Sequence, residues 1–522
     1  MNPTIKARNV IFLIVFHIVS CVSGFSAEMF VSPDIDSQSI VYDAINRLQN
    51  QSLVPRKLSG VSTMTDAYVR SIYLWILENN KEDINIHARE DLNLIENYLT
   101  QREMSSTKIK DFSFEMNLKG GAWFTNSRSI SQLETDARIN PLLNELGGRF
   151  QSQGGQAWIE PHFTARFGGW SAIEVAPIFP LGWNREDSNL EFKPSLYLGY
   201  FKLGSGAFES TLGRFTAKWG QGYSGSLILG GHQLPLTGLR IENTKPIVLP
   251  WWLHVLGQTR FNFIVSILDG DQKFPHSVFV AQRLSILPKQ WLELGFAQSI
   301  ILGGEGSPEA NIIDLISETF GARVGDITQT NLSNRNFMVD YRFTFERLGN
   351  LSLYGEIFWE DCCGSGRWKD LSTLWGIRKP FRVGQIDSEV TVEWVSTIEI
   401  TYRNSVFTSG FVDRKRILGH PIGPDGMGLY VFLKNKLRSK LWSTLEVAFE
   451  RRGRKQVDQY LAPISNQFPS VQGIDTRLRA ILSPTYHLSN NLILMGGMGY
   501  EWVYNVGDHH LLTRLQVVLS GF

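Results

Sequence analysis

The feature that most constrains the fold of this chain is an alternation of apolar and polar residues that recurs from about residue 111 onward. Successive side chains of a β-strand point to opposite faces, so a period of two predicts strands with one apolar and one polar face. In one such segment the odd-numbered residues are apolar and the even-numbered ones mostly polar: Phe337, Val339, Tyr341, Phe343 and Phe345 alternate with Met338, Asp340, Arg342 and Thr344. The same pattern occurs at 386–402 and 441–450.

Alternation alone fits both a soluble sandwich, whose apolar faces meet in a core, and an outer-membrane barrel, whose apolar face meets lipid. The segments span about 9–13 residues, which suits a tilted strand that crosses the hydrocarbon layer, whereas sandwich strands are nearer 5–6. About eighteen of them follow one another, and Trp359, Tyr402 and Tyr500 near strand ends suit an interfacial girdle. The sequence therefore predicts an all-β fold, a large transmembrane antiparallel β-barrel of about 18 strands over residues 109–522.

The N-terminus has the layout of a secretory signal peptide, which we place at residues 1–26. Lys6 and Arg8 precede an apolar run at 10–22, which is followed by small residues. This run of about 13 residues is too short for a bilayer, which needs roughly 20. Cys21 ends a tetrapeptide that resembles a lipoprotein processing box, so its lipidation stays open.

Residues 27–108 differ from the rest, because their apolar residues recur at helical spacing. One set is Ile40, Val41, Ala44, Ile45 and Leu48, and the next is Val69, Ile72, Tyr73, Ile76 and Leu77. Short amphipathic helices need a surface to pack on, so we expect a helical bundle at the periplasmic end of the barrel.

Composition and motifs exclude several functions. A net charge of +1 gives no general attraction to nucleic acid. The adjacent residues Cys362 and Cys363 form no disulfide framework, and neighbours His509 and His510 point to opposite strand faces. Residues 222–226 lack the last glycine of a nucleophile elbow. We therefore expect no catalytic residue, no metal and no cofactor, although a barrel hydrolase assembled from distant strands stays an alternative.

Connection lengths predict the sidedness of the barrel, because periplasmic turns are short and outer loops are long. The short connections are 348–350, 383–385, 438–440 and 488–490, and the long ones, predicted to be external, are 303–334, 361–371, 404–427 and 452–474. The loop 404–427 contains the segment RILGHPIGPDG, in which proline and glycine make defined turns. Its His420 and Asp425 either hydrogen-bond a ligand or close the turn.

Three stretches resemble a known family: LGRFTAKWGQGYSGSLILGGHQLP at 212–235, VDYRFTFERLGNLSLYGEIFWED at 339–361 and TYRNSVFTSGFVDRKRILGHPIGPDG at 401–426. In this order they are similar to the capsule-assembly outer-membrane family called Wzi. The resemblance implies an eighteen-stranded barrel, plugged rather than open, with a periplasmic helical bundle. It also implies a surface lectin that helps tether capsular polysaccharide to the cell. The cysteine pair after Asp361 departs from the family's pattern.

Sugars bind through aromatic rings and planar polar groups, which suggests further candidate residues. Trp219, Tyr223 and His232 lie on a glycine-rich backbone, and Arg367 and Trp368 lie in a predicted outer loop. For Trp219 and Tyr223 the alternative is packing inside the barrel as part of a plug. The expected function is non-enzymatic binding or anchoring of surface polysaccharide in the outer membrane of a Gram-negative cell. The expected partners are that polysaccharide, outer-membrane lipid and the insertion machinery. A channel for small solutes or glycan is the main alternative.

Overall fold

The computed structural model describes residues 31–520, except for some segments and single positions. These are 36–38, 80–85, 102–111, 133–136, 185–188, 308–332, 361–370 and 454–474, together with 52, 55, 57, 62, 151, 206, 244 and 490. The predicted signal peptide with Cys21, and the pair Cys362 and Cys363, lie outside the described residues.

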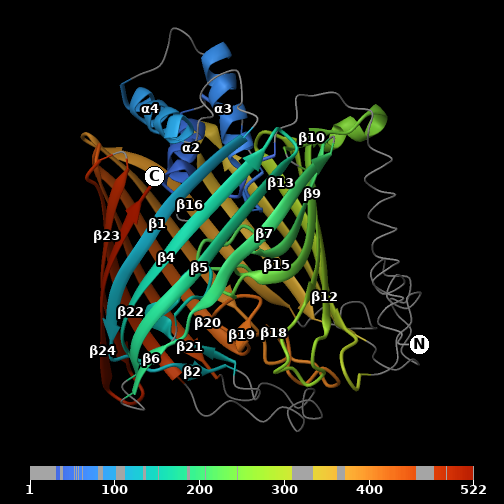
Figure 1. The fold of residues 1–522 in the computed structure, drawn as a ribbon, viewed down its shortest axis with the longest axis vertical. Helices are drawn as coiled ribbons and strands as arrows, with labels where there is room; N and C mark the ends of the chain where they lie inside the picture. The colour runs from blue at the N-terminus through green and yellow to red at the C-terminus, as the bar shows by residue number, and fades with distance from the viewer. Residues whose placement is uncertain are drawn as a thin grey trace.

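Eighteen antiparallel strands form a closed barrel, in which each strand pairs with the next and β24 pairs with β1 (Figure 1). This confirms the predicted barrel of about 18 strands. The strands are β1 (Phe112–Thr125), β4 (Gly154–Phe167), β5 (Ser171–Asn184), β7 (Ser195–Ser205), β8 (Phe208–Phe215), β9 (Leu236–Asn243), β11 (Gln258–Ile267), β12 (Val278–Lys289), β13 (Leu292–Leu302), β14 (Ser333–Phe345), β15 (Leu351–Glu360), β16 (Ser372–Val383), β17 (Ile386–Ser396), β20 (Gly426–Arg438), β21 (Leu441–Arg452), β22 (Asp475–His487), β23 (Leu492–Val503) and β24 (Asp508–Leu519).

Short elements complete the sheet and the connections. The strand β6 (Asn189–Phe192) pairs with β5, and β10 (Ile247–Val248) pairs with β11. Two small hairpins join β2 (Ile130–Ser131) to β3 (Arg138–Ile139) and β18 (Val412–Asp413) to β19 (Arg416–Ile417). Three 3₁₀ helices are η1 (Pro141–Leu143), η2 (Trp251–Leu256) and η3 (Glu346–Leu348).

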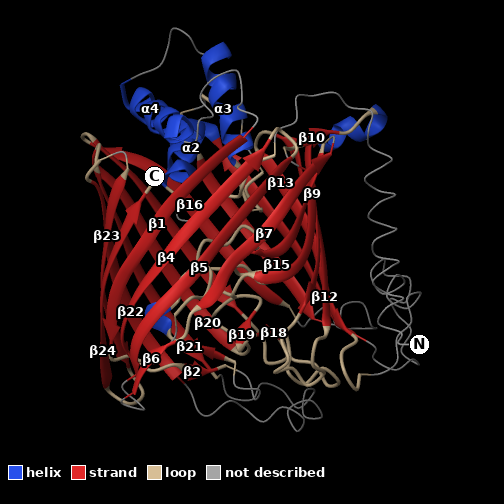
Figure 2. Cartoon of the chain, viewed as in Figure 1, coloured by secondary structure: helices blue, strands red, loops and turns tan. Residues whose placement is uncertain are grey.

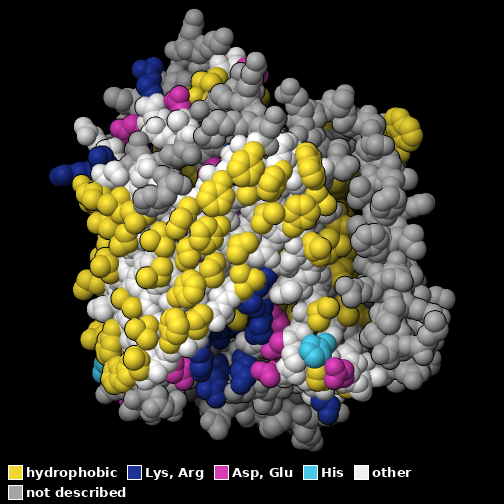
Figure 3. Space-filling model, viewed as in Figure 1, with side chains coloured by type: hydrophobic (Ala, Val, Ile, Leu, Met, Phe, Trp, Pro, Cys, Tyr) yellow, Lys and Arg dark blue, Asp and Glu magenta, His cyan; other side chains and the backbone are white. Residues whose placement is uncertain are grey.

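The apolar face of the strands points outward, as the alternation predicts. In β14 the inward residues Met338 and Asp340 are buried, whereas Phe345 on the other face is exposed. Figure 3 shows apolar side chains spread over the face of the barrel wall that is in view, with charged side chains gathered toward its lower edge. A closed barrel leaves no strand edge unpaired, and its lipid-facing band is apolar, so this surface suits hydrocarbon. No helix in the part of the chain that the structure describes is long and apolar enough to span a bilayer.

One predicted strand is too long. The alternation at 386–402 continues to Tyr402, but β17 ends at Ser396 and the chain then turns into the lumen. Tyr402 is fully buried there, so its place in an interfacial girdle is wrong. The hydroxyl of Tyr402 explains why it is inside, because it donates to the carbonyl oxygen of Leu227 at 2.8 Å and accepts from the N–H of His420 at 2.8 Å.

Most connections sort by length between the two ends of the barrel; the exceptions are the long connection 244–257 at the helix end and the short turn 504–507 at the loop end. The short turn before β15 lies beside the helices, because the side-chain amide of Asn350 donates to the carbonyl oxygen of Asn50 at 2.6 Å. Antiparallel order then places the turns 384–385, 439–440 and 488–491 at the same end, which we call the helix end. The long connections 303–332, 361–371, 397–425 and 453–474 leave the strands at the opposite end, which we call the loop end.

Three helices, α2 (Ile40–Asn50), α3 (Asp66–Asn79) and α4 (Ile86–Gln101), cover the helix end (Figure 2). Their apolar faces form a core of their own, which includes Val41, Ile45, Val69, Ile76, Ile95 and Leu99. The Ser39 hydroxyl accepts from the N–H of Val41 at 3.4 Å and so caps α2. Ion pairs join this helical region to the inner wall, for example Lys434 of β20 to Asp43 of α2 at 2.9 Å.

Candidate functional site

Two segments fold into the lumen as a plug, which we define as residues 216–235 and 397–425. They share one apolar core with the wall: Leu227, Ile228, Leu229, Tyr402, Phe411 and Leu418 from the plug pack with Phe358, Leu374 and Tyr430 from β15, β16 and β20. The prediction that 404–427 is an external loop is therefore wrong for most of its length. The segment leaves β17 at the loop end but returns into the barrel, where its apolar side chains are buried.

Carboxylates of the wall hold the backbone of the plug. Glu356 of β15 accepts the N–H groups of Gly222 and Leu227, each at 2.8 Å. Glu393 of β17 accepts the two N–H groups of residues 223–224, at 2.5 and 2.7 Å. Both carboxylates are fully buried. Each therefore satisfies two buried donors of an irregular segment, which would otherwise be costly inside a protein.

The glycines of this segment allow the close approach. A Cβ atom on Gly222 would lie 1.9 Å from the carbonyl oxygen of Gly225 and 2.6 Å from the side chain of Leu374. Gly225 has a φ of +151° and lies against the His420 ring, where a Cβ would come within 2.9 Å. The glycine-rich sequence is thus a packing requirement of the plug.

The nearest approach to a catalytic arrangement is the contact between Ser224 and His420. The Ser224 Oγ lies 3.2 Å from His420 Nε2 and donates to the Glu393 carboxylate at 2.5 Å. His420 Nδ1 accepts the N–H of Ile422 at 3.1 Å, and burial lowers the pKa of His420 to about 3. The neutral ring therefore carries its proton on Nε2 and donates to Ser224.

A histidine that donates to a serine cannot take the proton of that serine, as a nucleophile would require. His420 is fully buried and Ser224 is buried as well, so a substrate has no access to either. The contact between Ser224 and His420 joins the two segments of the plug, 216–235 and 397–425. It is a structural hydrogen-bond chain.

The structure separates the sequence-predicted site residues. Trp219 is 1% exposed and pairs through its backbone with Leu229, so it packs the plug and presents no surface to a glycan. Tyr223 keeps 39% of its surface exposed, packs edge-on against Phe432 and lies under the Lys434 ammonium at 4.7 Å. The plug alternative is therefore correct for Trp219 and partly correct for Tyr223.

The remaining candidates do not form one site either. Asp425 has a left-handed φ of 49°, and its backbone bonds to Ile398 and Gly453, so it closes a turn. His232 is half-buried in the plug, and burial lowers its pKa well below the ordinary value. Arg367 and Trp368 lie outside the described residues. His420, as shown above, is interior.

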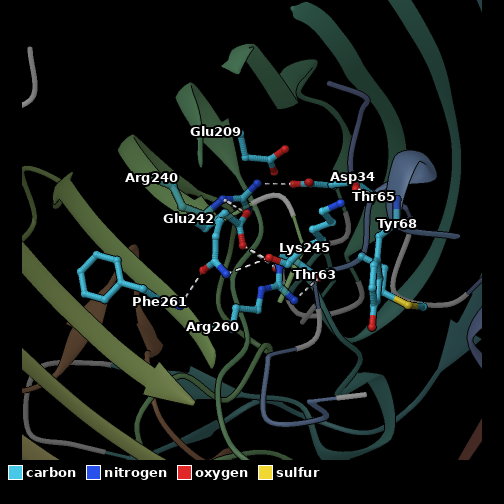
Figure 4. A network of polar contacts seen from close by, with 12 residues as sticks. Asp34, Thr63, Thr65, Tyr68, Glu209, Arg240, Glu242, Lys245, Arg260 and Phe261 are labelled. Carbon is cyan, nitrogen blue, oxygen red and sulfur yellow. Dashed lines mark hydrogen bonds and ion pairs between the residues drawn. The ribbon is translucent and has the colours of Figure 1, made fainter. Parts of the chain in front are cut away.

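A buried ion network ties the N-terminal segment to the wall (Figure 4). Arg240 donates to Asp34 at 2.5 Å and pairs with Glu242 at 2.9 Å, while Arg260 pairs with Glu242 at 2.7 Å. Burial would raise the pKa of Asp34, but Arg240 and Lys202 outweigh it and hold this pKa below its ordinary value.

Three carboxylates of this network, those of Asp34, Glu209 and Glu242, lie within 4.8 Å of one another. Lys202 pairs with Asp34 at 2.6 Å and with Glu209 at 3.1 Å. Lysine and arginine side chains thus already neutralise the three carboxylates. The cluster therefore suits a structural ion-pair network better than a site for a divalent metal ion.

Comparison with known proteins agrees with this architecture. The family model described as "Capsule assembly protein Wzi" matches residues 126–514. The chain belongs to the Wzi family. The Escherichia coli outer-membrane protein Wzi, described as a carbohydrate-binding β-barrel involved in group 1 capsule assembly, has the same fold, with a TM-score of 0.69 and 17% identity over 95% of this chain and 100% of that one. As a large closed β-barrel of this family, the protein resides in the outer membrane.

A second relative is an uncharacterized 55.8 kDa protein in the cps region of Klebsiella pneumoniae. It is 31% identical over 159 residues, which span 30% of this chain and 31% of that protein. The match therefore covers less than a third of the Klebsiella relative. Pseudomonas aeruginosa OccK5 (OpdH) aligns over 79% of this chain and 99% of its own, with 9% identity and a TM-score of 0.44.

The residues that hold this Wzi-family plug were not identified from the sequence. Glu356 and Glu393 were visible only as polar positions on alternating strands. Their parity shows that they face the lumen, and a carboxylate inside a barrel needs a partner. The partner backbone lies more than a hundred residues away in the chain, at 222–227, so no local pattern connects the two.

Proposed function

We propose that this protein is a non-enzymatic outer-membrane anchor that binds surface polysaccharide at its loop end. The loop end faces the outside and the helix end faces the periplasm, since outer-membrane barrels have long outer loops and short periplasmic turns. Membership of the Wzi family supports this function. So does the carbohydrate binding named for the E. coli relative.

The observation that carries the proposal is the plug. Its backbone is hydrogen-bonded to the buried glutamates Glu356 and Glu393, and its side chains share the core of the wall. A lumen filled in this way suits a fixed surface for binding better than a pathway for solutes. In planar bilayers we therefore expect the purified protein to show no steady ion conductance, which a channel of this diameter would show.

The direct test is retention of polymer. Cells that lack the gene should release polysaccharide into the medium, and the wild-type gene should restore it to the surface. Trp368→Ala should weaken retention, because an aromatic ring in this predicted outer loop would stack on sugar. The matched control is Trp183→Ala, because Trp183 is 44% exposed near the loop end of β5. Equal retention by both variants at equal barrel levels would remove Trp368 from the site.

A further inference from the structure

A cavity of about 840 Å³ lies between the helical region and the plug. Residues of α2 and α4 form its roof, inward residues of the wall form its sides, and Lys218 and Gly231 of the plug lie at its floor. Ligand sites in proteins occupy about 300–1,000 Å³, so the cavity has the size of a binding site. We infer that it is a second carbohydrate site, which takes a short stretch of a neutral oligosaccharide from the periplasmic side.

The roof presents two ladders of asparagine side chains. Asn46 and Asn50 are four residues apart on α2, and Asn93 and Asn97 are four residues apart on α4. A spacing of four places each pair on one helical face, and all four residues line the cavity. A planar amide offers a carbonyl acceptor beside an NH₂ donor, which matches two adjacent hydroxyl groups of a sugar ring.

The opposite wall adds groups of the same chemistry. Gln516 of β24 points inward and lines the cavity, as does Asn117 of β1. Serine and threonine hydroxyls occupy several of the other inward wall positions, including Thr164, Thr444, Ser483 and Thr485. Hydroxyl and amide groups that surround a space on several sides recognise a polyhydroxylated ligand better than an apolar one.

The charged residues of the cavity are largely paired with one another, which favours a neutral ligand. The ion pairs are Arg47–Asp91 at 2.8 Å, Lys434–Asp43 at 2.9 Å, Lys436–Glu90 at 2.8 Å, Arg378–Glu389 at 2.5 Å and Arg382–Asp387 at 2.6 Å. A charged ligand would have to compete with partners that are already in place. A neutral sugar needs only amide and hydroxyl groups, such as the amides of Asn93 and Asn97.

The direction of entry follows from the lining. The cavity reaches the helix-end turns at Gly349, Lys440 and Ser489, whereas plug residues close its other side. An oligosaccharide would therefore enter beside the helices and stop at the plug. This site rests on the proposed function for its class of ligand, but it is separate from the loop-end surface.

The test uses the purified full-length protein in detergent and a neutral probe. The probe is the fraction of four- to eight-sugar fragments that carries no charge, prepared from the polysaccharide of the producing strain. Affinity is measured by calorimetry, and hydrogen exchange of α2 and α4 is followed with and without the fragments. The variant Asn93→Leu/Asn97→Leu removes two amides but keeps the branched shape of the side chains and does not lower helix propensity. The control is Thr100→Leu, which changes an exposed residue of α4 outside the cavity.

We expect the double variant to bind at least tenfold more weakly, since it loses the hydrogen bonds that the two amides make to the sugar. Thr100→Leu should bind the fragments like the wild type. In both the wild type and Thr100→Leu, the fragments should slow hydrogen exchange in α2 and α4. Equal affinity of the wild type and the double variant would overturn the cavity site but leave the proposed function intact. If the wild type binds the intact polymer but not the neutral fragments, the cavity site alone is overturned. If it binds neither, the proposed function itself fails.

Discussion

The plug and the helical region both enter the barrel, but they are attached to it by different kinds of contact. The plug has no core of its own, because Leu227 and Phe411 pack directly against wall residues. Its backbone N–H groups donate hydrogen bonds to glutamates of the wall. The helical region has its own core, and the contacts that join it to β20 are ion pairs between side chains. The plug is therefore part of the barrel, whereas the three helices pack around their own core. The connection between α2 and α3 does enter the barrel, where Glu293 of β13 accepts the N–H groups of Ser59 and Gly60 at 2.9 and 2.8 Å.

The two kinds of contact differ in free energy. A buried donor that loses its acceptor costs about 1–3 kcal/mol, whereas an ion pair that water reaches contributes about 0–1 kcal/mol. Glu393 is fully buried, but the side chains of Asp43 and Lys434 are 33% and 25% exposed. Substitutions in the plug should therefore lower the stability of the whole barrel. Substitutions in the helices should lower the stability of the helical region alone.

The largest effect is expected from Glu393→Leu. The change leaves the N–H groups of residues 223–224 and the hydroxyl of Tyr354, which donates to Glu393 at 2.5 Å, without their acceptor. We expect a loss of about 4 kcal/mol in the free energy of unfolding, or release of the plug from the wall. The first is measured by denaturant titration, and the second by the appearance of ion conductance in planar bilayers.

The control for this change is Glu191→Leu, which removes an exposed carboxylate paired with exposed Lys193. It should leave both measurements as in the wild type. A Glu393→Leu protein with an unchanged denaturation midpoint and no conductance would mean that the carboxylate does not hold the plug.

Gly222→Ala should have the next largest effect. The new Cβ would meet the carbonyl oxygen of Gly225 at 1.9 Å, and a backbone atom cannot move aside as a flexible side chain can. We expect destabilisation by about 1–3 kcal/mol, seen as a lower temperature for the loss of the compact, heat-modifiable form on gels. In Gly270→Ala the nearest atom is 3.7 Å from the Cβ, so that variant should match the wild type. Similar shifts in both would show that the plug tolerates displacement.

The same contrast explains how much of the molecule the sequence predicts. The strands of the wall follow from local sequence. Apolar and polar residues alternate along 337–345, and β14 places Met338 and Asp340 inside as predicted. The helices are local as well, because their apolar spacing predicts a core that includes Ile45 and Ile76. These elements depend on periodicity, which a sequence shows directly.

The plug has no period, so the sequence does not place it. The alternation of 386–402 runs on past Ser396, and only the tertiary contact of Tyr402 with Leu227 shows that the chain has already turned inward. Residues such as Trp219 and His420 have the composition of a binding site, but they are buried by segments distant in sequence. The candidate site was therefore misplaced for a physical reason: a polar or aromatic side chain suits a packed interior as well as a ligand, once its hydrogen bonds are satisfied.

Asp91→Asn tests the helical side of the comparison. The Asp91 carboxylate is 1% exposed and accepts two N–H groups of Arg47, at 2.9 and 2.8 Å. Lys436 lies 3.4 Å away. The variant should lose about 2 kcal/mol of stability in the helical region alone, because charged donors lose a charged acceptor. Hydrogen exchange should speed up in α2 and α4 and stay unchanged in the strands.

Glu90→Gln is the matched control for Asp91→Asn. Glu90 is the neighbouring residue and also bonds to Lys436, at 2.8 Å, but its side chain is 42% exposed. Water can replace this contact, so we expect a change below about 1 kcal/mol. If Asp91→Asn speeds exchange in β20 and β21 as much as in α4, the helical region is not a separate unit.

The smallest effect is expected from acid acting on Asp43. Burial opposes ionisation of this carboxyl, but Lys434 and Arg47 outweigh it and hold the pKa of Asp43 below its ordinary value. A carboxyl with a lowered pKa stabilises the folded state above the unfolded pKa of about 4, and this contribution is lost as the pH falls from there through the lowered value. The pair is partly exposed, so the contribution is below about 1 kcal/mol. Calorimetry should show the helical transition at a lower temperature at pH 3 than at pH 5, and Asp43→Asn should reduce this difference. An identical difference in the variant would assign the acid sensitivity to other carboxyls of the helical region, and the ion pair to β20 would then contribute nothing measurable to docking.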